Sequence, residues 1–451
     1  MNRLIKYTLI ASAILVVTSR SVSAGENWPQ FRGHDARGVI DSPTNLPTKW
    51  SAEENVVWKS ELPGRGWSSP IVWQDRIFLT TVINEGETEE AKKGLYFGGN
   101  RIKPPESIHQ WLVICLSLES GNVLWRQSVH EGKPETSVHI KNSFASETPV
   151  TDGEHVFAYF GGLGIYCFDM EGNPVWSRPI EPRKMRYGWG TAASPIMDDQ
   201  RLYIINDNEE ASYVMAIDKR TGKEVWRTDR DEGSNWSTPY LWAHASGTEL
   251  VTPGTDKIRS YDLAGDLLWS LEGMSSITIA TPYSYNDLLI VSSGYVLDRS
   301  KPLYAIRPGA QGDITLTEEQ DSNDWIAWSQ PMAGPYNPST VAYQGNVYVL
   351  YDRGFFAAFD ASTGEEVYGK QRIPKGRAFT ASPWVYAGKI FCLNEDGVTH
   401  VIDAGDTFRV SHTNALADDE MAMATPAIVD DHLLIRTDRF LYCIGHSDSQ
   451  P

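Results

Sequence analysis

The 451-residue sequence predicts an all-β fold, an eight-bladed β-propeller built from four-stranded antiparallel blades. Three observations carry this prediction. Ser-Pro or Thr-Pro pairs recur along the chain, short apolar runs separated by turn residues follow them, and a Gly-x-x-x-Trp segment closes many of the units. The period is about 45 residues, which is typical of propeller blades. Because a fixed repeat outweighs a domain count taken from chain length, we expect one ring rather than three ordinary domains.

The Ser/Thr-Pro pairs mark the start of each unit. Seven residues after most of these prolines a β-rich run begins, and hairpin residues such as Asp152-Gly153 lie between the two. One unit lacks the pair: Thr340 holds the proline position, because Gly345-Asn346 follows at the expected offset. The pairs are Ser69-Pro70, Thr148-Pro149, Ser194-Pro195, Thr238-Pro239, Thr281-Pro282, Ser382-Pro383 and Thr425-Pro426.

Each unit then continues with a third strand, a glycine turn and a fourth strand that carries Trp. The third strand often ends in Asp, as in Ala216-Ile217-Asp218. Trp328 and Tyr368 occupy the Trp position in two later units. No helical periodicity lies between these runs, so each unit reads as four short antiparallel strands. The Gly-to-Trp pairs are Gly121 and Trp125, Gly172 and Trp176, Gly222 and Trp226, and Gly265 and Trp269.

The two ends of the repeat complete each other. The last unit, residues 424–446, supplies three strands and no fourth. Near the start, Asn55-Val56-Val57-Trp58 resembles Asn122-Val123-Leu124-Trp125, a fourth strand without its first three. We therefore expect the N-terminal strand to close the last blade, which removes an open sheet edge. The propeller should span residues 51–446, with residues 447–451 as a tail.

Residues 1–24 are predicted to be a secretory signal peptide. Arg3 and Lys6 precede an apolar run over residues 7–18, and Val22-Ser23-Ala24 supplies the small residues of a cleavage site. A bilayer span takes about 20 apolar residues, so an uncleaved anchor is the less favoured alternative. We expect export to the periplasm or the medium after cleavage near Ala24, and no membrane insertion. Residues 25–50, with Trp28 and Trp50, should form an arm packed on the disc.

The charge balance restricts the partners. The chain has 40 basic and 58 acidic residues, a formal net charge of −18. A field of that sign repels phosphate backbones and anionic lipid, so we expect no nucleic-acid partner. A closed propeller needs no second copy to cover its edges, so we expect a monomer.

The closing motif, Gly-x-x-x-Trp after a strand that ends in Asp, resembles the quinoprotein or PQQ-repeat propeller family over residues 50 to 446. That family includes eight-bladed alcohol dehydrogenases and BamB-like assembly factors of bacterial outer membranes. Three more stretches are similar to a subgroup of secreted PQQ-like repeat proteins, many of them from planctomycete-type bacteria. These are Trp28-Pro29-Gln30-Phe31-Arg32-Gly33, Gly64-Arg65-Gly66-Trp67-Ser68-Ser69-Pro70 and residues 145–153.

The resemblance raises the question of quinone chemistry. The family's dehydrogenases hold PQQ between a Trp and a disulfide of adjacent cysteines, with a bound calcium ion and an Asp base. The chain's four cysteines are isolated in sequence and fit packed thiols, and it lacks the long inter-blade insertions that build those active sites. We therefore expect no cofactor, with PQQ and calcium as the alternative. The cysteines are Cys115, Cys167, Cys392 and Cys443.

Other catalytic and metal signatures are missing from the sequence. It has no Gly-x-Ser-x-Gly elbow, no His-Glu-x-x-His helix and no phosphate loop ending in Lys-Ser/Thr. The segments 206–210 and 394–397 offer oxygen ligands but fit polar hairpin turns better than calcium loops. We assign no catalytic residue and no metal ligand.

The residues just before the Ser/Thr-Pro pairs are the candidate ligand-binding residues. They bring cations, aromatic rings and amides to one end of the channel, where they would form a funnel that grips an anion or stacks a planar ring. Alternatively, the aromatics plug the channel and the cations pair with acids such as Glu147. Phe144 occupies an equivalent place. The candidates are Arg65, Trp67, Lys141, Asn142, Arg186, Tyr187, Trp189, Asn235, Trp236, Tyr336, Asn337, Arg377 and Phe379.

One insertion, residues 84 to 109 in the first unit, is long enough to be functional or disordered, and its Tyr96–Arg101 half could fold over a face of the disc. Three functions remain open. The first is an exported, noncatalytic scaffold that binds a partner protein or a small anionic or planar ligand at the funnel. The second is a PQQ-dependent alcohol or sugar oxidoreductase. The third, a glycan hydrolase or lyase, needs a carboxylate pair that the sequence does not place.

Overall fold

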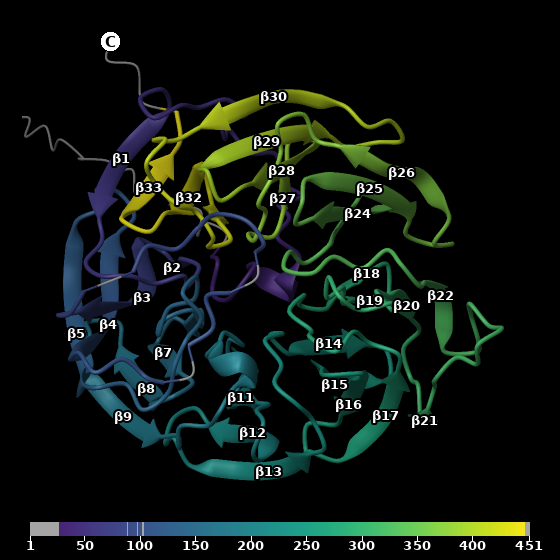
Figure 1. The fold of residues 1–451 in the computed structure, drawn as a ribbon, viewed down its shortest axis with the longest axis horizontal. Coiled ribbons are helices and arrows are strands. Elements are labelled where there is room, and N and C mark those ends of the chain that lie inside the picture. Colours follow the sequence, from purple (N-terminus) through teal and green to yellow (C-terminus); the bar gives the residue numbers. More distant parts are fainter. Residues whose placement is uncertain (1–26, 88, 97, 102, 447–451) are drawn as a thin grey trace, which may run out of the picture.

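The computed structural model describes residues 27–446 except 88, 97 and 102, so the predicted signal peptide, its cleavage site and the C-terminal tail lie outside the described residues. The described chain forms eight antiparallel sheets arranged as a ring around a central axis (Figure 1). The predicted all-β, eight-bladed propeller is thus confirmed. Two single-turn 3-10 segments occur in it, η1 (His34–Ala36) and η2 (Arg186–Gly188), and no described helix is long and apolar enough to cross a bilayer.

The blades follow one another in chain order, and within each blade the first strand lies innermost. Blade 1 contains β2 (Ile71–Trp73), β3 (Arg76–Asn84), β4 (His109–Ser117) and β5 (Val123–Gly132), and blade 2 contains β6 (Val150–Thr151), β7 (His155–Phe160), β8 (Gly164–Asp169) and β9 (Pro174–Pro179). Blade 3 contains β10 (Ile196–Met197), β11 (Arg201–Asn206), β12 (Ser212–Asp218) and β13 (Glu224–Arg230). Blade 4 contains β14 (Tyr240–His244), β15 (Gly247–Pro253), β16 (Lys257–Tyr261) and β17 (Leu267–Glu272).

The remaining blades repeat this order. Blade 5 contains β18 (Tyr283–Tyr285), β19 (Leu288–Ser292), β20 (Leu303–Ile306) and β22 (Ile326–Gln330), and blade 6 contains β23 (Val341–Tyr343), β24 (Asn346–Tyr351), β25 (Phe355–Asp360) and β26 (Glu366–Arg372). Blade 7 contains β27 (Trp384–Tyr386), β28 (Lys389–Leu393), β29 (Val398–Asp403) and β30 (Val410–Ala415). Blade 8 contains β31 (Ala427–Val429), β32 (His432–Arg436), β33 (Phe440–Ile444) and β1 (Val56–Glu61).

The ring closes as the sequence predicts. β1 pairs antiparallel with β33, and Trp58 lies opposite Cys443, the same register that sets Trp125 opposite Cys115 in blade 1. Blade 4 differs from the expected pattern, because the short β21 (Gly312–Asp313) adds to its outer strand β17 in parallel. That blade therefore has five strands.

The Ser/Thr-Pro pairs link neighbouring blades. In each linked pair, the backbone N–H of the Ser or Thr donates to the hydroxyl of its counterpart in the next blade. A buried backbone N–H needs a hydrogen-bond acceptor, and the Ser or Thr hydroxyl of the next blade supplies one for the N–H at this position. The bonds run from Ser69 to Thr148 (3.0 Å), Thr148 to Ser194 (2.9 Å), Ser194 to Thr238 (3.1 Å), Thr281 to Ser339 (2.9 Å), Ser339 to Ser382 (2.9 Å) and Ser382 to Thr425 (3.0 Å).

The Gly-x-x-x-Trp motif also joins blades. The turn glycine of one blade lies against the Trp ring of the preceding blade: a Cβ on Gly172 would lie 2.6 Å from the Trp125 ring. The Trp indole N–H then donates to a carbonyl at the same turn, as from Trp125 to Met170 (2.9 Å). The same contact joins Gly121 to Trp58, Gly222 to Trp176, Gly265 to Trp226 and Gly364 to Trp328.

The arm, residues 27–50, lies across the face of the disc at which the first hairpins of the blades turn. Its backbone forms hydrogen bonds with the backbone of Val72 in blade 1 and with that of Val385 in blade 7. Between these points η1 lies beside β14 and β18, visible behind the ring centre in Figure 1. Arg32, only 1% exposed, donates from Nη2 to the Thr340 carbonyl (2.8 Å). The arm thus covers the channel on this face.

Candidate binding face

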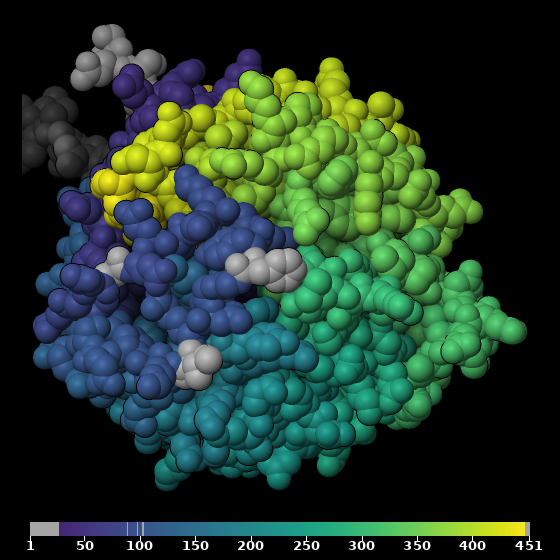
Figure 2. Space-filling view, in the orientation of Figure 1, coloured from purple at the N-terminus to yellow at the C-terminus, as the bar shows by residue number. Residues whose placement is uncertain are grey.

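All thirteen candidate residues lie in the linkers that run from the outer strand of one blade to the inner strand of the next. Because the four main strands of each blade run antiparallel, these linkers emerge at one end of the ring, together with the hairpins between second and third strands. We call this end the funnel face. It is the face toward the viewer in Figures 1 and 2, opposite the arm.

Lys141 is the most buried cation among the candidates. Its Nζ lies 2.6 Å from Oε1 of Glu395, and the two side chains are 11% and 1% exposed. Its backbone carbonyl accepts a hydrogen bond from the indole of Trp67 (2.7 Å), and Thr380 donates to the same Glu395 oxygen (2.6 Å). The ion pair joins the linker after blade 1 to blade 7, so it bridges segments far apart in sequence.

The three candidate amides bind the protein's own backbone and carboxylates. Asn142 Nδ2 donates to the carbonyl of Trp189 (2.7 Å), and Asn235 Nδ2 donates to that of Pro253 (2.7 Å). Asn337 Nδ2 donates to Oδ1 of Asp352 (2.6 Å), and burial raises the pKa of that carboxyl to about 6. These amides hold the linkers in place and do not point toward a free ligand.

The remaining cations lie nearer the surface. Arg186 donates from Nη1 to the carbonyl of Ser276 (2.9 Å). Arg377, with a side chain 69% exposed, forms a two-pronged ion pair with Asp396. Arg65 reaches the Lys141 carbonyl only at 3.4 Å, and burial lowers its pKa.

Glu147, the acid named as a partner for these cations, is held differently. It accepts bonds from the Gly161 N–H (3.0 Å) and the Thr191 hydroxyl, and burial raises its pKa. Among the described contacts, the candidate cations form ion pairs with other acids: Lys141 with Glu395 and Arg377 with Asp396.

The candidate aromatics divide into buried and outward rings. Trp236 is 7% exposed and donates to the Gly190 carbonyl (2.7 Å), and Phe379 is 1% exposed. Trp189 lies 5.6 Å from the Trp236 ring. Tyr187 stays 53% exposed, and its φ of 55° places it in the left-handed region that non-glycine residues rarely occupy.

The centre of the funnel face is filled by apolar side chains. The four buried members of this central cluster come from four successive linkers, and Leu95, which packs against them, comes from the long insertion in blade 1. The buried members are Met185, Trp236, Ile277 and Tyr336, and Leu95, Trp189 and Tyr295 are among those packed against them.

The described residues of the insertion between 85 and 108 lie over this cluster, and we call them the cap. Figure 2 shows its blue side chains reaching from blade 1 to the middle of the face. Gly99 accepts the Ile140 N–H (3.0 Å), and Asn100 accepts the indole N–H of Trp189 (2.7 Å). Gly99 and Asn100 thus lie against the funnel face, as expected for this half of the insertion.

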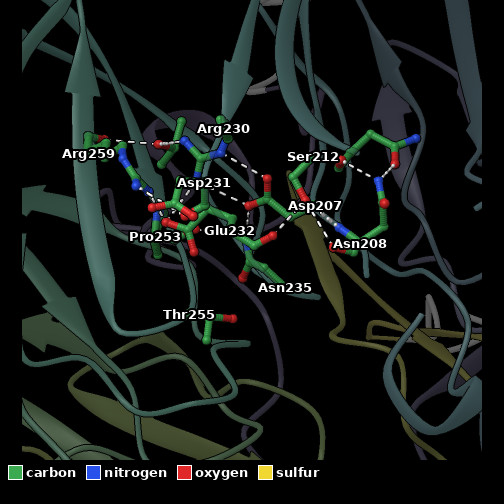
Figure 3. Close-up of polar contacts among 12 residues, drawn as sticks. Asp207, Asn208, Ser212, Arg230, Asp231, Glu232, Asn235, Pro253, Thr255 and Arg259 are labelled. Atoms are coloured by element: carbon green, nitrogen blue, oxygen red, sulfur yellow. Dashed lines mark hydrogen bonds and ion pairs between the residues drawn. The ribbon is translucent and has the colours of Figure 1, made fainter. Parts of the chain in front are cut away.

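A second polar cluster beside the funnel escaped the sequence analysis (Figure 3). Arg230 forms a two-pronged pair with Asp207 (2.8 and 3.1 Å), and both side chains are fully buried. Arg259 pairs with the equally buried Glu232, and Asn235 reaches both Asp207 and Pro253. This network fixes the linker between blades 3 and 4.

Glu395 and Asp207 were both within reach of sequence reasoning. Each follows the end of a second strand, in the segments interpreted as polar turns, 394–397 and 206–210. Aligning the residues after each second strand would have shown acids recurring there, with Asp352 as a third.

The residues do not fit the PQQ site that the resemblance implies. Cys115, Cys167 and Cys443 each lie opposite a fourth-strand Trp within their own blade, and Cys392 lies on β28. All four thiols are free and buried, and the centre of the funnel is filled by the cluster around Trp236. Among the described residues, no group of three or more His, Cys, Asp or Glu side chains could hold a metal ion.

Known proteins resemble the chain in sequence and in fold. A family model described as "Outer membrane protein assembly factor BamB" matches residues 109–321. The assembly factor BamB of Burkholderia pseudomallei is 26% identical over 248 residues, which cover 48% of this chain and 61% of that protein. BamB of Alkalilimnicola ehrlichii is 27% identical over 130 residues, 29% of this chain and 30% of that protein. The matches therefore span less than two thirds of these relatives.

Solved structures show the same fold at low identity. Quinohemoprotein alcohol dehydrogenase ADHIIG of Pseudomonas putida HK5 superposes with a TM-score of 0.57 at 13% identity, covering 94% of this chain and 81% of that one. The quinohemoprotein alcohol dehydrogenase of Comamonas testosteroni gives 0.57 at 12% identity, covering 94% and 82%. At this identity the likeness concerns the fold alone.

Proposed function

Because the chain is a BamB-like, PQQ-type β-propeller repeat protein, we propose that it is an exported, noncatalytic scaffold that binds a partner protein with its funnel face. Three features support this function: a predicted export signal, a propeller that resembles named assembly factors, and a face whose centre is filled by its own side chains. Fold alone does not decide function, so the proposal depends on the site.

The filled centre is the observation that carries the proposal. An enzyme of this fold needs a cavity at the funnel, whereas here Leu95 and four buried linker residues occupy it. The buried cation and amides are bonded within the protein, as Lys141 is to Glu395. What the face offers outward is a rim of exposed groups, among them Tyr187 (53%) and Leu297 (61%). Exposed aromatic and apolar side chains beside cations are typical of protein interfaces.

The strain at Tyr187 supports the same proposal. A tyrosine at φ 55° costs about 1–2 kcal/mol relative to the right-handed regions, and that conformation presents its ring to solvent above Trp189. Strained residues that the surrounding structure maintains are found mainly at functional sites.

Site-specific photo-crosslinking tests the binding face. A photoreactive phenylalanine at Tyr187 should give a discrete adduct in cells that export the protein, because partner contacts concentrate there. The matched control is Val225 on the rim of blade 3, which is similarly exposed at 47% and should give none. Equal adducts at both positions, or none at Tyr187, would contradict the proposed face.

Quinone titration tests the noncatalytic part. Adding PQQ and calcium to the purified protein should give no saturable change in absorbance and no dye reduction with alcohols or sugars, since the thiols are isolated and the funnel is filled. A stoichiometric quinone spectrum with dye reduction would establish the oxidoreductase instead.

A further inference from the structure

We propose that the mouth of the funnel is a peptide-binding site, occupied in cis by Lys93, Gly94 and Leu95 of the cap. A partner segment of the same chemistry, a cation, then glycine, then a leucine-sized apolar side chain, binds there by displacing the cap. The inference rests on the proposed function and names the part of the partner that is recognised.

The polar half of this site holds one residue, Gly94, by both of its backbone groups. The N–H of Gly94 donates to Oε2 of Glu395 (2.6 Å), and its carbonyl accepts from Nζ of Lys141 (3.0 Å). Buried charges are costly unless they are paired and hydrogen-bonded, and the backbone of Gly94 completes the hydrogen bonding of the Lys141–Glu395 pair. Hydrogen bonds to charged groups are also the strong ones.

The pair does not depend on the cap for its position. Thr380 donates to Glu395 (2.6 Å), and the backbone N–H of Glu395 donates to the Ala378 carbonyl (2.8 Å). Trp67 fixes the backbone of Lys141 (2.7 Å). A site built on groups held by other elements persists when its occupant leaves, which reduces the ordering cost of binding.

The apolar half of the site holds the side chain of the next residue, Leu95. Leu95 packs against the central cluster, whose buried members are contributed by four successive linkers. With Leu95 in place, Ile277 and Trp236 are 1% and 7% exposed, so the side chain that occupies this half covers apolar surface. An apolar side chain entering it gains the usual energy of hydrophobic burial.

The position before the glycine favours a cation. Lys93 Nζ donates to the carbonyl of Glu420 (2.9 Å) and lies 3.5 Å from Oδ1 of Asp396. Gly94 has a φ of 88°, which only glycine adopts freely. The three positions together define the sequence Lys-Gly-Leu as the recognised element.

The cap is suited to being displaced. Leu95 itself is only partly buried, Lys92 and Gly98 are exposed, and none of the described residues between β3 and β4 belongs to a strand. A site blocked by a cis occupant binds a second ligand with an affinity reduced by the fraction of open molecules. Weakening the cap should therefore strengthen binding in trans.

A labelled peptide tests this competition on the full-length protein. The probe is a fluorescein-labelled heptapeptide of residues 90–96, Glu-Ala-Lys-Lys-Gly-Leu-Tyr, followed by anisotropy. Leu95→Ser in the protein should tighten peptide binding about tenfold or more, and Lys93→Ala should tighten it less. The control Leu267→Ser, on the outer strand β17 of blade 4 and 55% exposed, should leave binding unchanged. Adding Glu395→Gln to Leu95→Ser should abolish the gain.

Three results would overturn the inference: equal affinities for the Leu95→Ser and parent proteins, equal binding of a peptide with Ser in place of Leu, or a gain that survives Glu395→Gln. Melting temperatures of each variant show that it is folded. If Tyr187 crosslinks a partner but the peptide does not bind, this inference fails and the proposed function stands. If the peptide binds but Tyr187 yields no adduct, the proposed function fails alone.

Discussion

Replacing Arg230 with Met should lower the free energy of unfolding by about 3–5 kcal/mol, because it leaves buried carboxylates without a counter-charge. Arg230 and its partner Asp207 (Figure 3) are both fully buried. Arg230 also donates to Thr252 (2.6 Å) and Tyr261 (3.0 Å). Methionine has a similar length and fills much of the space, so the loss reports charge and hydrogen bonding more than packing. Urea denaturation at neutral pH measures it.

Arg227 on the same strand provides the control. Its side chain is 36% exposed and pairs with Glu224 (2.8 Å), so Arg227→Met should cost no more than about 1 kcal/mol. Adding Asp207→Leu to Arg230→Met should recover part of the stability, since both members of the main pair are then gone. Equal losses in the free energy of unfolding for Arg227→Met and Arg230→Met would show that burial does not determine how much this cluster contributes to stability.

The fold was predictable because each repeat position has a local chemical reason. The hydroxyl of Ser194 meets the N–H of Thr148 in the blade before it, and that bond needs Ser or Thr at the position. A fixed offset also brings each turn glycine to the preceding blade's Trp, as Gly172 comes to Trp125. Such rules act within one or two units, so a repeat in the sequence shows them directly. The extra strand β21 follows no repeat and was missed for that reason.

The candidate site was less predictable, because its contacts cross the ring. The sequence brought Lys141 and Trp67 to the right face, but nothing local pairs Lys141 with Glu395, 254 residues away. Leu95 lies in a segment without repeat periodicity, so its place in the central cluster has no sequence signal. The pocket and plug alternatives rest on the same residue types, and they separate only once the positions of the cap and the linkers are known.

Gly222→Ala should lower the free energy of unfolding by roughly 2–5 kcal/mol, from two separable causes. Gly222 has a φ of 70°, and a left-handed alanine costs roughly 1–2 kcal/mol. Its added Cβ would also lie 2.5 Å from the Trp176 ring, and overpacking of this kind costs roughly 1–3 kcal/mol. Trp176 cannot turn away freely, because its indole donates to the Lys219 carbonyl (2.9 Å). Thermal and urea unfolding measure the sum.

Gly388 separates the two causes. It has nearly the same φ, 69°, but an added Cβ there meets nothing within 4 Å, so Gly388→Ala should show the backbone cost alone. The difference between the two variants then measures the contact between blades 2 and 3. Trp176→Phe, which removes part of the ring, should reduce the penalty of Gly222→Ala in the double variant. If the two alanine variants lose equal stability, the glycine serves only the turn, and Trp packing does not explain why the motif recurs.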